Sequence, residues 1–118
     1  MMKRYLRTAA LAPLLATLAT GCVTRPEPLY YWGDYQGQVY GYLNSDKTPE
    51  AQILALEADM EKARSRGKSV PPGYHAHLGM LYGKTGRTDD MIAHFDQEKA
   101  LFPESAPFMD FLMRNYKR

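Results

Sequence analysis

The chain has 118 residues, with 15 basic and 13 acidic side chains and one cysteine, which leaves room for a single domain. All of the acidic residues follow position 22, so removal of the segment before it would leave 12 basic against 13 acidic side chains. A near-neutral chain lacks the basic surface of a nucleic-acid-binding protein, so no nucleic acid is expected as a partner. One cysteine also excludes an internal disulfide.

Residues 1–21 have the pattern of a secretory signal peptide. Three basic residues precede an uncharged, mostly apolar run at residues 8–20, which is too short to span a bilayer as a helix. The run ends in Leu-Ala-Thr-Gly-Cys at positions 18–22, which resembles the lipobox of bacterial lipoproteins, although Ala19 stands where leucine is usual. The resemblance implies that Cys22 is acylated and attaches the mature protein to a membrane through the lipid anchor only.

Residues 22–28 include two prolines and show no periodicity, which predicts a short lipidated tether. Val23 follows Cys22 in place of the aspartate that resembles an inner-membrane retention signal in enteric bacteria. We therefore expect the protein at the outer membrane of the bacterial cell envelope, facing the periplasm rather than the cell surface. The folded domain is expected at residues 29–118.

Five of the nine tyrosines and the only tryptophan lie between positions 30 and 42. Trp32, Tyr35, Val39 and Tyr42 recur at helical intervals, which predicts a first helix. Two interpretations of the aromatic residues stay open. They form packing between helices, or they form an exposed surface that binds protein or sugar. The candidates for glycan contact are Trp32, Tyr31 and Tyr35.

A second helix is predicted after residue 48. Thr48, Pro49 and Glu50 are typical of a helix start, with a capping hydroxyl, a proline and an acid in the first turn. Four apolar residues then share one face before Gly67 ends the helix. They are Ile53, Leu56, Met60 and Ala63.

Residues 74–105 predict a helix, a tight turn at Gly86 and another helix that Thr88 is expected to cap. Ser105 is expected to cap a last helix. The helix that starts at Thr88 is expected to bury four side chains, those of Met91, Ile92, Phe95 and Leu101.

Five positions of this stretch have a spacing that resembles the tetratricopeptide repeat, a helical hairpin with a period of about 34 residues. They are Leu78, Gly79, Tyr82, Phe95 and Pro103. Leu112 and Tyr116 follow Leu78 and Tyr82 by one such period, which implies a closing half-repeat. The same interval before Leu78 reaches only Asn44, so the first hairpin is expected to be a degenerate repeat. The resemblance implies an all-α fold of tetratricopeptide-like stacked hairpins with about five helices.

Three segments are similar to a family of small uncharacterised bacterial lipoproteins. They are Trp32–Tyr35, Pro71–Gly79, and Leu101–Ser105 together with Phe108–Phe111. The family tends to be encoded beside a lipoprotein of the curli-secretion-channel type and another small lipoprotein. The resemblance implies that the partners are other envelope lipoproteins, including a curli-secretion-channel-like one.

The three histidines are the only group with metal-ligand character. His75 and His77 are two positions apart, so on a helix they point about 200° away from each other and cannot ligate from one face. Structural roles for these two and for His94 are therefore favoured over a metal site. The sequence also offers no paired nucleophile and base, so we expect no cofactor, no metal and no enzymatic activity.

The leading hypothesis is a non-catalytic scaffold that binds another envelope protein on the inner face of its stacked helices. The residues predicted to bind the partner are Met80, Lys84, Asp110 and Arg114. The alternative is a module that contacts peptidoglycan or another glycan through the aromatic first helix.

Overall fold

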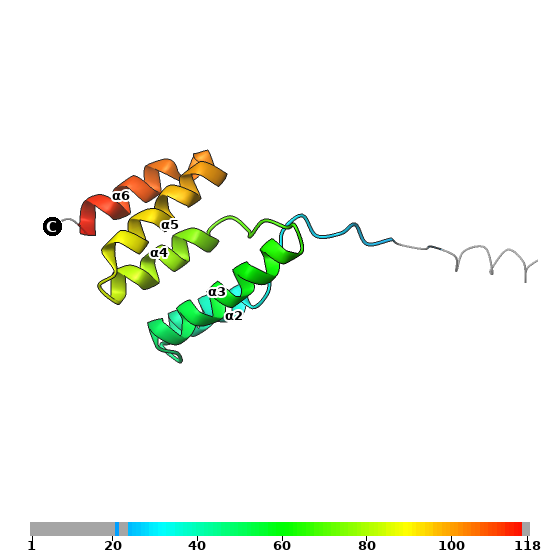
Figure 1. The fold of residues 1–118 in the computed structure, drawn as a ribbon, viewed down its shortest axis with the longest axis horizontal. Coiled ribbons are helices and arrows are strands. Elements are labelled where there is room, and N and C mark those ends of the chain that lie inside the picture. Colours follow the sequence, from blue (N-terminus) through cyan, green and yellow to red (C-terminus); the bar gives the residue numbers. More distant parts are fainter. Residues whose placement is uncertain (1–20, 22–23, 117–118) are drawn as a thin grey trace, which may run out of the picture.

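The computed structural model describes residue 21 and residues 24–116, which contain five α-helices (Figure 1). In chain order they are α2 (Tyr35–Asn44), α3 (Pro49–Ser65), α4 (Tyr74–Lys84), α5 (Thr88–Leu101) and α6 (Ala106–Tyr116), with a 3₁₀ turn, η1 (Pro103–Ser105), before α6. The predicted all-α class and number of helices are confirmed. None of these described helices is long and apolar enough to cross a bilayer. The signal peptide and Cys22 lie outside the described residues.

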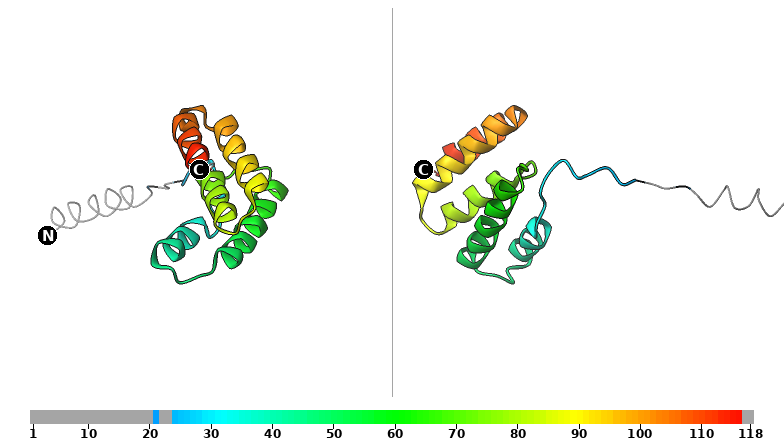
Figure 2. Two further views of the ribbon diagram at one scale, coloured as in Figure 1. Left: turned by 90° about the vertical axis from the view of Figure 1, so that its left-hand side faces the viewer. Right: turned by 45° about the vertical axis from the view of Figure 1, so that its right-hand side comes forward.

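Successive helices run antiparallel and form two hairpins and a single last helix (Figures 1 and 2). α2 packs on α3, α4 packs on α5, and α6 packs on α5. The contact between α3 and α4 joins the two hairpins. The N-terminal tether leaves from the end of the domain at which α2 and α4 begin and α3 ends (Figure 1).

One hydrophobic core runs through the domain and draws most heavily on α4. Tyr74, Leu78, Leu81 and Tyr82 of this helix are all buried. The apolar face predicted for α3 is also confirmed, since Met60 is half-buried and the other three residues are buried. Burial of one face of each helix against its neighbours supplies most of the stability of such a small domain.

The close contact between α4 and α5 depends on Gly79. A Cβ atom at this position would lie 2.5 Å from Phe95 Cε1 and 3.2 Å from the carbonyl oxygen of Met91. Leu78, Tyr82 and Phe95 are buried around it. The absence of a side chain at Gly79 therefore lets the two helices approach closely.

A buried carboxylate holds the beginning of α4. Glu98 of α5 accepts hydrogen bonds from the backbone N–H groups of Gly73 at 2.6 Å and Ala76 at 3.2 Å. These N–H groups have no partner within their own helix, and the positive end of the helix dipole attracts the carboxylate. Gly73 has a φ of +89°, a conformation that favours glycine. Glu98 thus ties the turn before α4 to the second helix of the same hairpin.

Asp59 of α3 forms the equivalent cap at the beginning of α2. It accepts hydrogen bonds from the Asp34 N–H at 2.7 Å and from Lys62 Nζ at 3.0 Å. Burial alone would raise the pKa of Asp59, but these two donors outweigh burial and hold the pKa below its usual value. Each first helix of a hairpin is therefore capped by a carboxylate from the second.

The two hairpins repeat at a constant interval that is longer than the tetratricopeptide period. The separation between Tyr35 and Tyr74, the first residues of α2 and α4, equals that between the first residues of α3 and α5. Asp59 and Glu98 are separated by the same interval. The shorter period has no counterpart in the first hairpin because α3 is longer than α5, with 17 residues against 14. The connection that follows α3 is also longer than the one that follows α5.

The structure corrects the expected start of the first helix and the position of one core residue. α2 begins at Tyr35, and Trp32 lies before it because Gly33 adopts a φ of +48° that interrupts helical geometry. Leu101 was expected to be buried but is half exposed, because it is the last residue of α5.

The expected helix caps are correct at one position of three. Thr48 caps α3 by accepting a hydrogen bond from the Ala51 N–H at 3.2 Å. Thr88 instead lies inside α5 as its first residue, after an Arg87 that makes no side-chain cap. Ser105 belongs to η1, and its hydroxyl donates to the Phe102 carbonyl oxygen at 2.7 Å.

Replacement of Glu98 by glutamine should destabilise the domain by about 1–3 kcal/mol, because the new NH₂ group would face backbone donors and the charge at the helix start would be lost. Urea denaturation followed by circular dichroism measures the change. The matched control is Glu104→Gln in η1, an exposed position, where the effect should stay within about 0.5 kcal/mol. Equal effects at the two positions would show that the cap does not hold α4.

Alanine at Gly79 should lower the free energy of unfolding by about 1–3 kcal/mol, because its Cβ would push α4 away from α5. Alanine at Gly41 of α2 should instead raise it by up to about 1 kcal/mol, since the nearest atom there belongs to the flexible Lys47 side chain at 3.4 Å. Thermal denaturation of both variants gives the sign. Stabilisation by Gly79→Ala would contradict the close contact.

Candidate functional site

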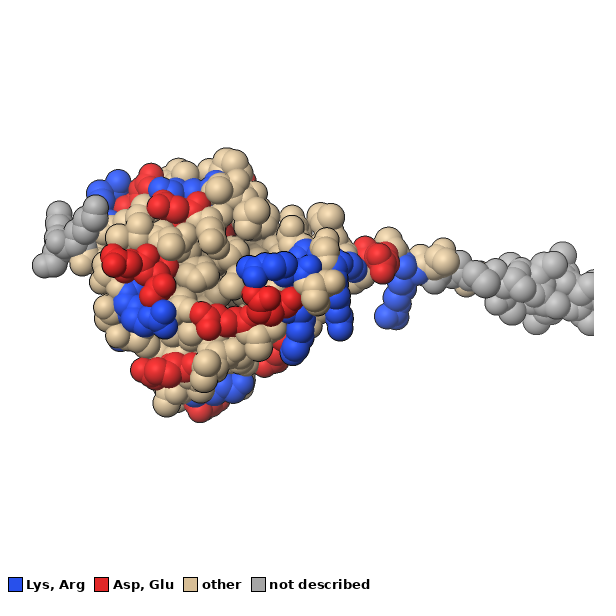
Figure 3. Space-filling view, viewed as in Figure 1, with Lys and Arg blue, Asp and Glu red and all other residues tan. Residues whose placement is uncertain are grey.

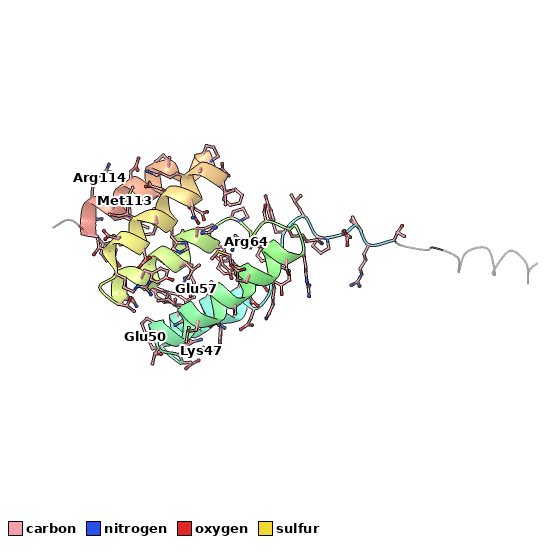
Figure 4. The ribbon with its side chains drawn as sticks, viewed as in Figure 1. Lys47, Glu50, Glu57, Arg64, Met113 and Arg114 are labelled. Atoms are coloured by element: carbon pink, nitrogen blue, oxygen red, sulfur yellow. The ribbon has the colours of Figure 1, made fainter. Side chains whose placement is uncertain are left out.

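The residues predicted to bind a partner on the inner face differ in how free they are to do so. Lys84 Nζ lies over the Tyr42 ring at 4.2 Å from its centre. Asp110 forms an ion pair with Lys99 at 3.0 Å, and Met80 is half-buried against the core. Arg114, near the end of α6, is exposed and forms no ion pair with any described residue (Figure 4). Arg114 is thus the most available of the four.

The outer side of α6 carries an apolar patch. Phe108 is 56% exposed and Phe111 is 50% exposed, and their rings stack with centres 6.4 Å apart. Met109 is the residue of α6 that turns fully into the core. Because Phe108 and Phe111 are one helical turn apart, they share a face that no other described helix covers.

The three candidate aromatic residues do not form one flat surface. Trp32 is 43% exposed, and its ring is tilted by 32° relative to the ring of Tyr35. Tyr35 is half-buried against Tyr74, with ring centres 5.1 Å apart. Tyr31 is half-buried with the Arg66 guanidinium 5.0 Å above its ring. The rings of Tyr31 and Tyr35 therefore pack on the domain, whereas Trp32 faces solvent.

A hollow of about 470 Å³ lies between α3 and α5. The loop before α4 and the first turn of α4 complete its lining. Met60, Val70 and Leu101 give it apolar walls, and Arg64 belongs to its lining (Figure 4). His75 lies in the hollow beside a residue of α5, His94. Sequence analysis missed this hollow, because its residues come from three helices and one loop with no common spacing.

The two histidines in the hollow form a direct contact. His75 Nδ1 and His94 Nδ1 are 2.9 Å apart, and the rings stack at 5.2 Å. Burial, aided by the neighbouring imidazole, lowers the pKa of His75 to about 4. Burial also lowers the pKa of His94, although the carboxylates of Glu57 and Asp90 oppose the shift. Both rings are thus neutral at pH 7, and a hydrogen bond between them requires that at least one ring lacks its second proton.

His77 points to the opposite side of α4, as the helical spacing predicts. Its ring packs edge-on against Tyr42 at 5.2 Å. Burial, followed by the charge of Lys84, lowers the pKa of His77 to about 4. Its Nε2 atom has no hydrogen-bond partner among the described residues. Within residues 24–116, no group of three side chains is placed to hold a metal ion.

The remaining residues of the repeat pattern lie near the end of the stack. Pro103 begins η1, and Leu112 is half-buried against the core. Tyr116 lies over Gly83, where a Cβ atom would be 2.8 Å from the Tyr116 ring. α6 therefore contacts α4 through the side that carries Leu112 and Tyr116, and this leaves Phe108 and Phe111 outside.

The exposed phenylalanines are the binding candidates that sequence reasoning missed. The sequence predicts a closing half-repeat at this position, and the last helix of a stacked array usually presents a polar outer side. For that reason no binding role was predicted for Phe108 or Phe111. The signal was present in the spacing. Phe108 and Phe111 are three positions apart and lie on a different side of the helix from Met109 and Met113.

The helical domain described above matches a family of proteins that carry the domain of unknown function DUF4810, over residues 29–112. The match covers most of the chain, and the protein belongs to this family. No curated protein and no solved structure matches the chain.

The folded domain should lose stability as the pH falls from about 6.5 to about 4. In the unfolded chain His75 and His77 bind a proton near pH 6.5, whereas in the folded domain their pKa values are about 4. Protons therefore bind the unfolded state preferentially in this window, and full stability is present only above it. Urea denaturation at a series of pH values measures the slope.

A variant with both His75→Gln and His77→Gln should show a shallower slope between pH 6.5 and 4.5, whatever its absolute stability. His94 remains in that variant and should account for the residual slope, since its pKa is also lowered. An unchanged slope would show that the two rings are not buried in the neutral form.

Proposed function

We propose that the chain is an outer-membrane lipoprotein, anchored through Cys22 and facing the periplasm, that serves as a non-catalytic protein-binding scaffold. The signal-peptide pattern and the sequence Leu-Ala-Thr-Gly-Cys at positions 18–22 support the anchor. The partner would be another lipoprotein of the envelope, including one of the curli-secretion-channel type. Neither nucleic acid nor a cofactor is part of the proposal.

The observation that supports binding most directly is the apolar patch on α6. Phe108 and Phe111 are each at least half exposed on the last helix of the stack. Aromatic residues are enriched among the side chains that contribute most to protein interfaces. Leaving two stacked rings in water is unfavourable for an isolated domain, so a cover for this face is expected in the assembled state.

The proposed arrangement of the helices is that of tetratricopeptide-like repeats. Gly79 at the α4–α5 contact and Tyr116 over Gly83 are consistent with it. In a stack of this kind each helix is covered by the next one, so the uncovered side of α6 would receive a helix from the partner. Arg114, exposed one helical turn beyond Phe111, would pair with an acidic residue of that helix.

A glycan-contacting module receives less support. Sugar rings stack on flat aromatic surfaces, whereas Trp32 is tilted relative to Tyr35 and the rings of Tyr31 and Tyr35 are half-buried. Trp32 remains the exposed ring of the three.

The photo-crosslinking amino acid benzoylphenylalanine, introduced at Phe111, should give an adduct with a second lipoprotein in intact membranes. The reason is that the α6 patch is covered by that partner. Mass spectrometry of the adduct should identify a peptide from a protein that carries its own lipid-modified cysteine.

The matched control is the same crosslinker at Tyr40, an aromatic residue of α2 that is 68% exposed. The yield from position 111 should exceed the yield from position 40 several-fold, because the interface is local. Equal yields, or an adduct at 111 that contains no lipoprotein, would contradict the proposed function.

A further inference from the structure

The end of the domain that carries the tether combines exposed apolar residues with basic residues. Leu29 is 78% exposed and Trp32 is 43% exposed. Arg64 and Arg66 lie at the end of α3, and Lys68 follows them in the next loop. Figure 3 shows Lys and Arg side chains gathered where the domain meets the tether. We call Arg25, Leu29, Trp32, Arg64, Arg66 and Lys68 the tether face.

The tether is fixed to this face by contacts with the loop after α3. The Tyr31 N–H donates to the Ser69 carbonyl oxygen at 2.8 Å. Lys68 Nζ donates to the Pro28 carbonyl oxygen at 3.4 Å and lies 3.8 Å from a Glu27 carboxylate oxygen. The chain is therefore held at the domain from about Glu27 onward.

This attachment limits the distance between the domain and the lipid. Cys22 precedes Glu27 by five positions, which span at most about 18 Å when fully extended. A domain held so close to a bilayer cannot turn its tether end far away from the surface.

The tether face has an excess of positive charge. Three of its neighbouring carboxylates are already paired: Asp59 with Lys62, Glu61 with Arg64, and Glu27 with Lys68. Arg25 and Arg66 form no ion pair with a described residue. Basic residues next to a lipid anchor are attracted to anionic lipid headgroups, and tryptophan is enriched at the boundary between headgroups and water.

We propose that the tether face docks on the membrane, with Trp32 and Leu29 at headgroup level and Arg25 and Arg66 against lipid phosphates. The inference rests on the proposed anchor at Cys22. It fixes the orientation of the domain, because the helices that extend away from the tether face then point away from the bilayer. It also gives the exposed Trp32 a lipid partner in place of a sugar.

Trp32 is the only tryptophan of the chain, so tryptophan fluorescence reports the position of this one side chain. The acylated full-length protein is reconstituted into vesicles of phosphatidylethanolamine and phosphatidylglycerol, with or without bromine on the lipid chains. Tryptophan is enriched at headgroup level, and bromine quenches a tryptophan that it contacts, so the Trp32 emission should be lower in vesicles with brominated lipid than in vesicles without it.

The matched control moves the tryptophan to the far end of α2 through Trp32→Phe combined with Leu43→Trp. Leu43 is 73% exposed near the end of that helix, about 12 Å along the helix axis from Tyr35, the first residue of α2. Its emission should hardly change with brominated lipid. Equal quenching at positions 32 and 43 would overturn the proposal.

Charge reversal tests the basic contribution. Arg25→Glu combined with Arg66→Glu should reduce quenching of Trp32. Arg87→Glu, in the turn between α4 and α5 and away from the tether face, should leave it unchanged. Flotation of the vesicles separates the two claims. Protein that fails to float contradicts the anchor and this inference with it, whereas protein that floats with unquenched Trp32 contradicts the orientation alone.

Discussion

The arrangement of the helices depends on two carboxylates that reach across their own hairpins. Glu98 binds the backbone at the start of α4, and Asp59 binds the backbone at the start of α2. A buried carboxylate is costly unless backbone donors and helix dipoles compensate for the lost water. These hydrogen bonds also fix positions, because each carboxylate sets where one helix of a hairpin begins relative to the other. The close contact at Gly79 then requires that α4 keep this position against α5.

These caps also explain why the tether end of the described domain differs from the outer side of its last helix. The caps lie at the end where the tether leaves, so the Gly33 turn, the exposed Trp32 and the basic end of α3 are fixed near one another. α6 receives no such cap from a following helix within the described residues, and its outer side carries Phe108 and Phe111. One end thus suits a lipid surface, and the last helix suits a protein partner.

Periodicity in the sequence was sufficient for the helices and for most of the core. Ile53, Leu56, Leu78 and Phe95 are buried as their spacing predicts, because one-sided apolar spacing is itself the cause of helix packing. The roles of Glu98 and Asp59 could not be predicted, since a buried carboxylate and a solvated one look alike in a sequence. The same holds for the contact between His75 and His94, which depends on how closely α4 and α5 approach. The family match leaves the function open, so the partner and the anchor remain proposals.

The central claim is that the outer side of α6 is covered by a protein in the native envelope. Cys22 is the only cysteine of the chain and would be acylated in the mature lipoprotein, so a cysteine introduced elsewhere can be labelled selectively with a membrane-permeant maleimide. In intact membranes Phe111→Cys should be protected while Tyr40→Cys reacts fully, and both should react once detergent has dissociated the assembly. Equal labelling of the two positions in intact membranes would contradict the account.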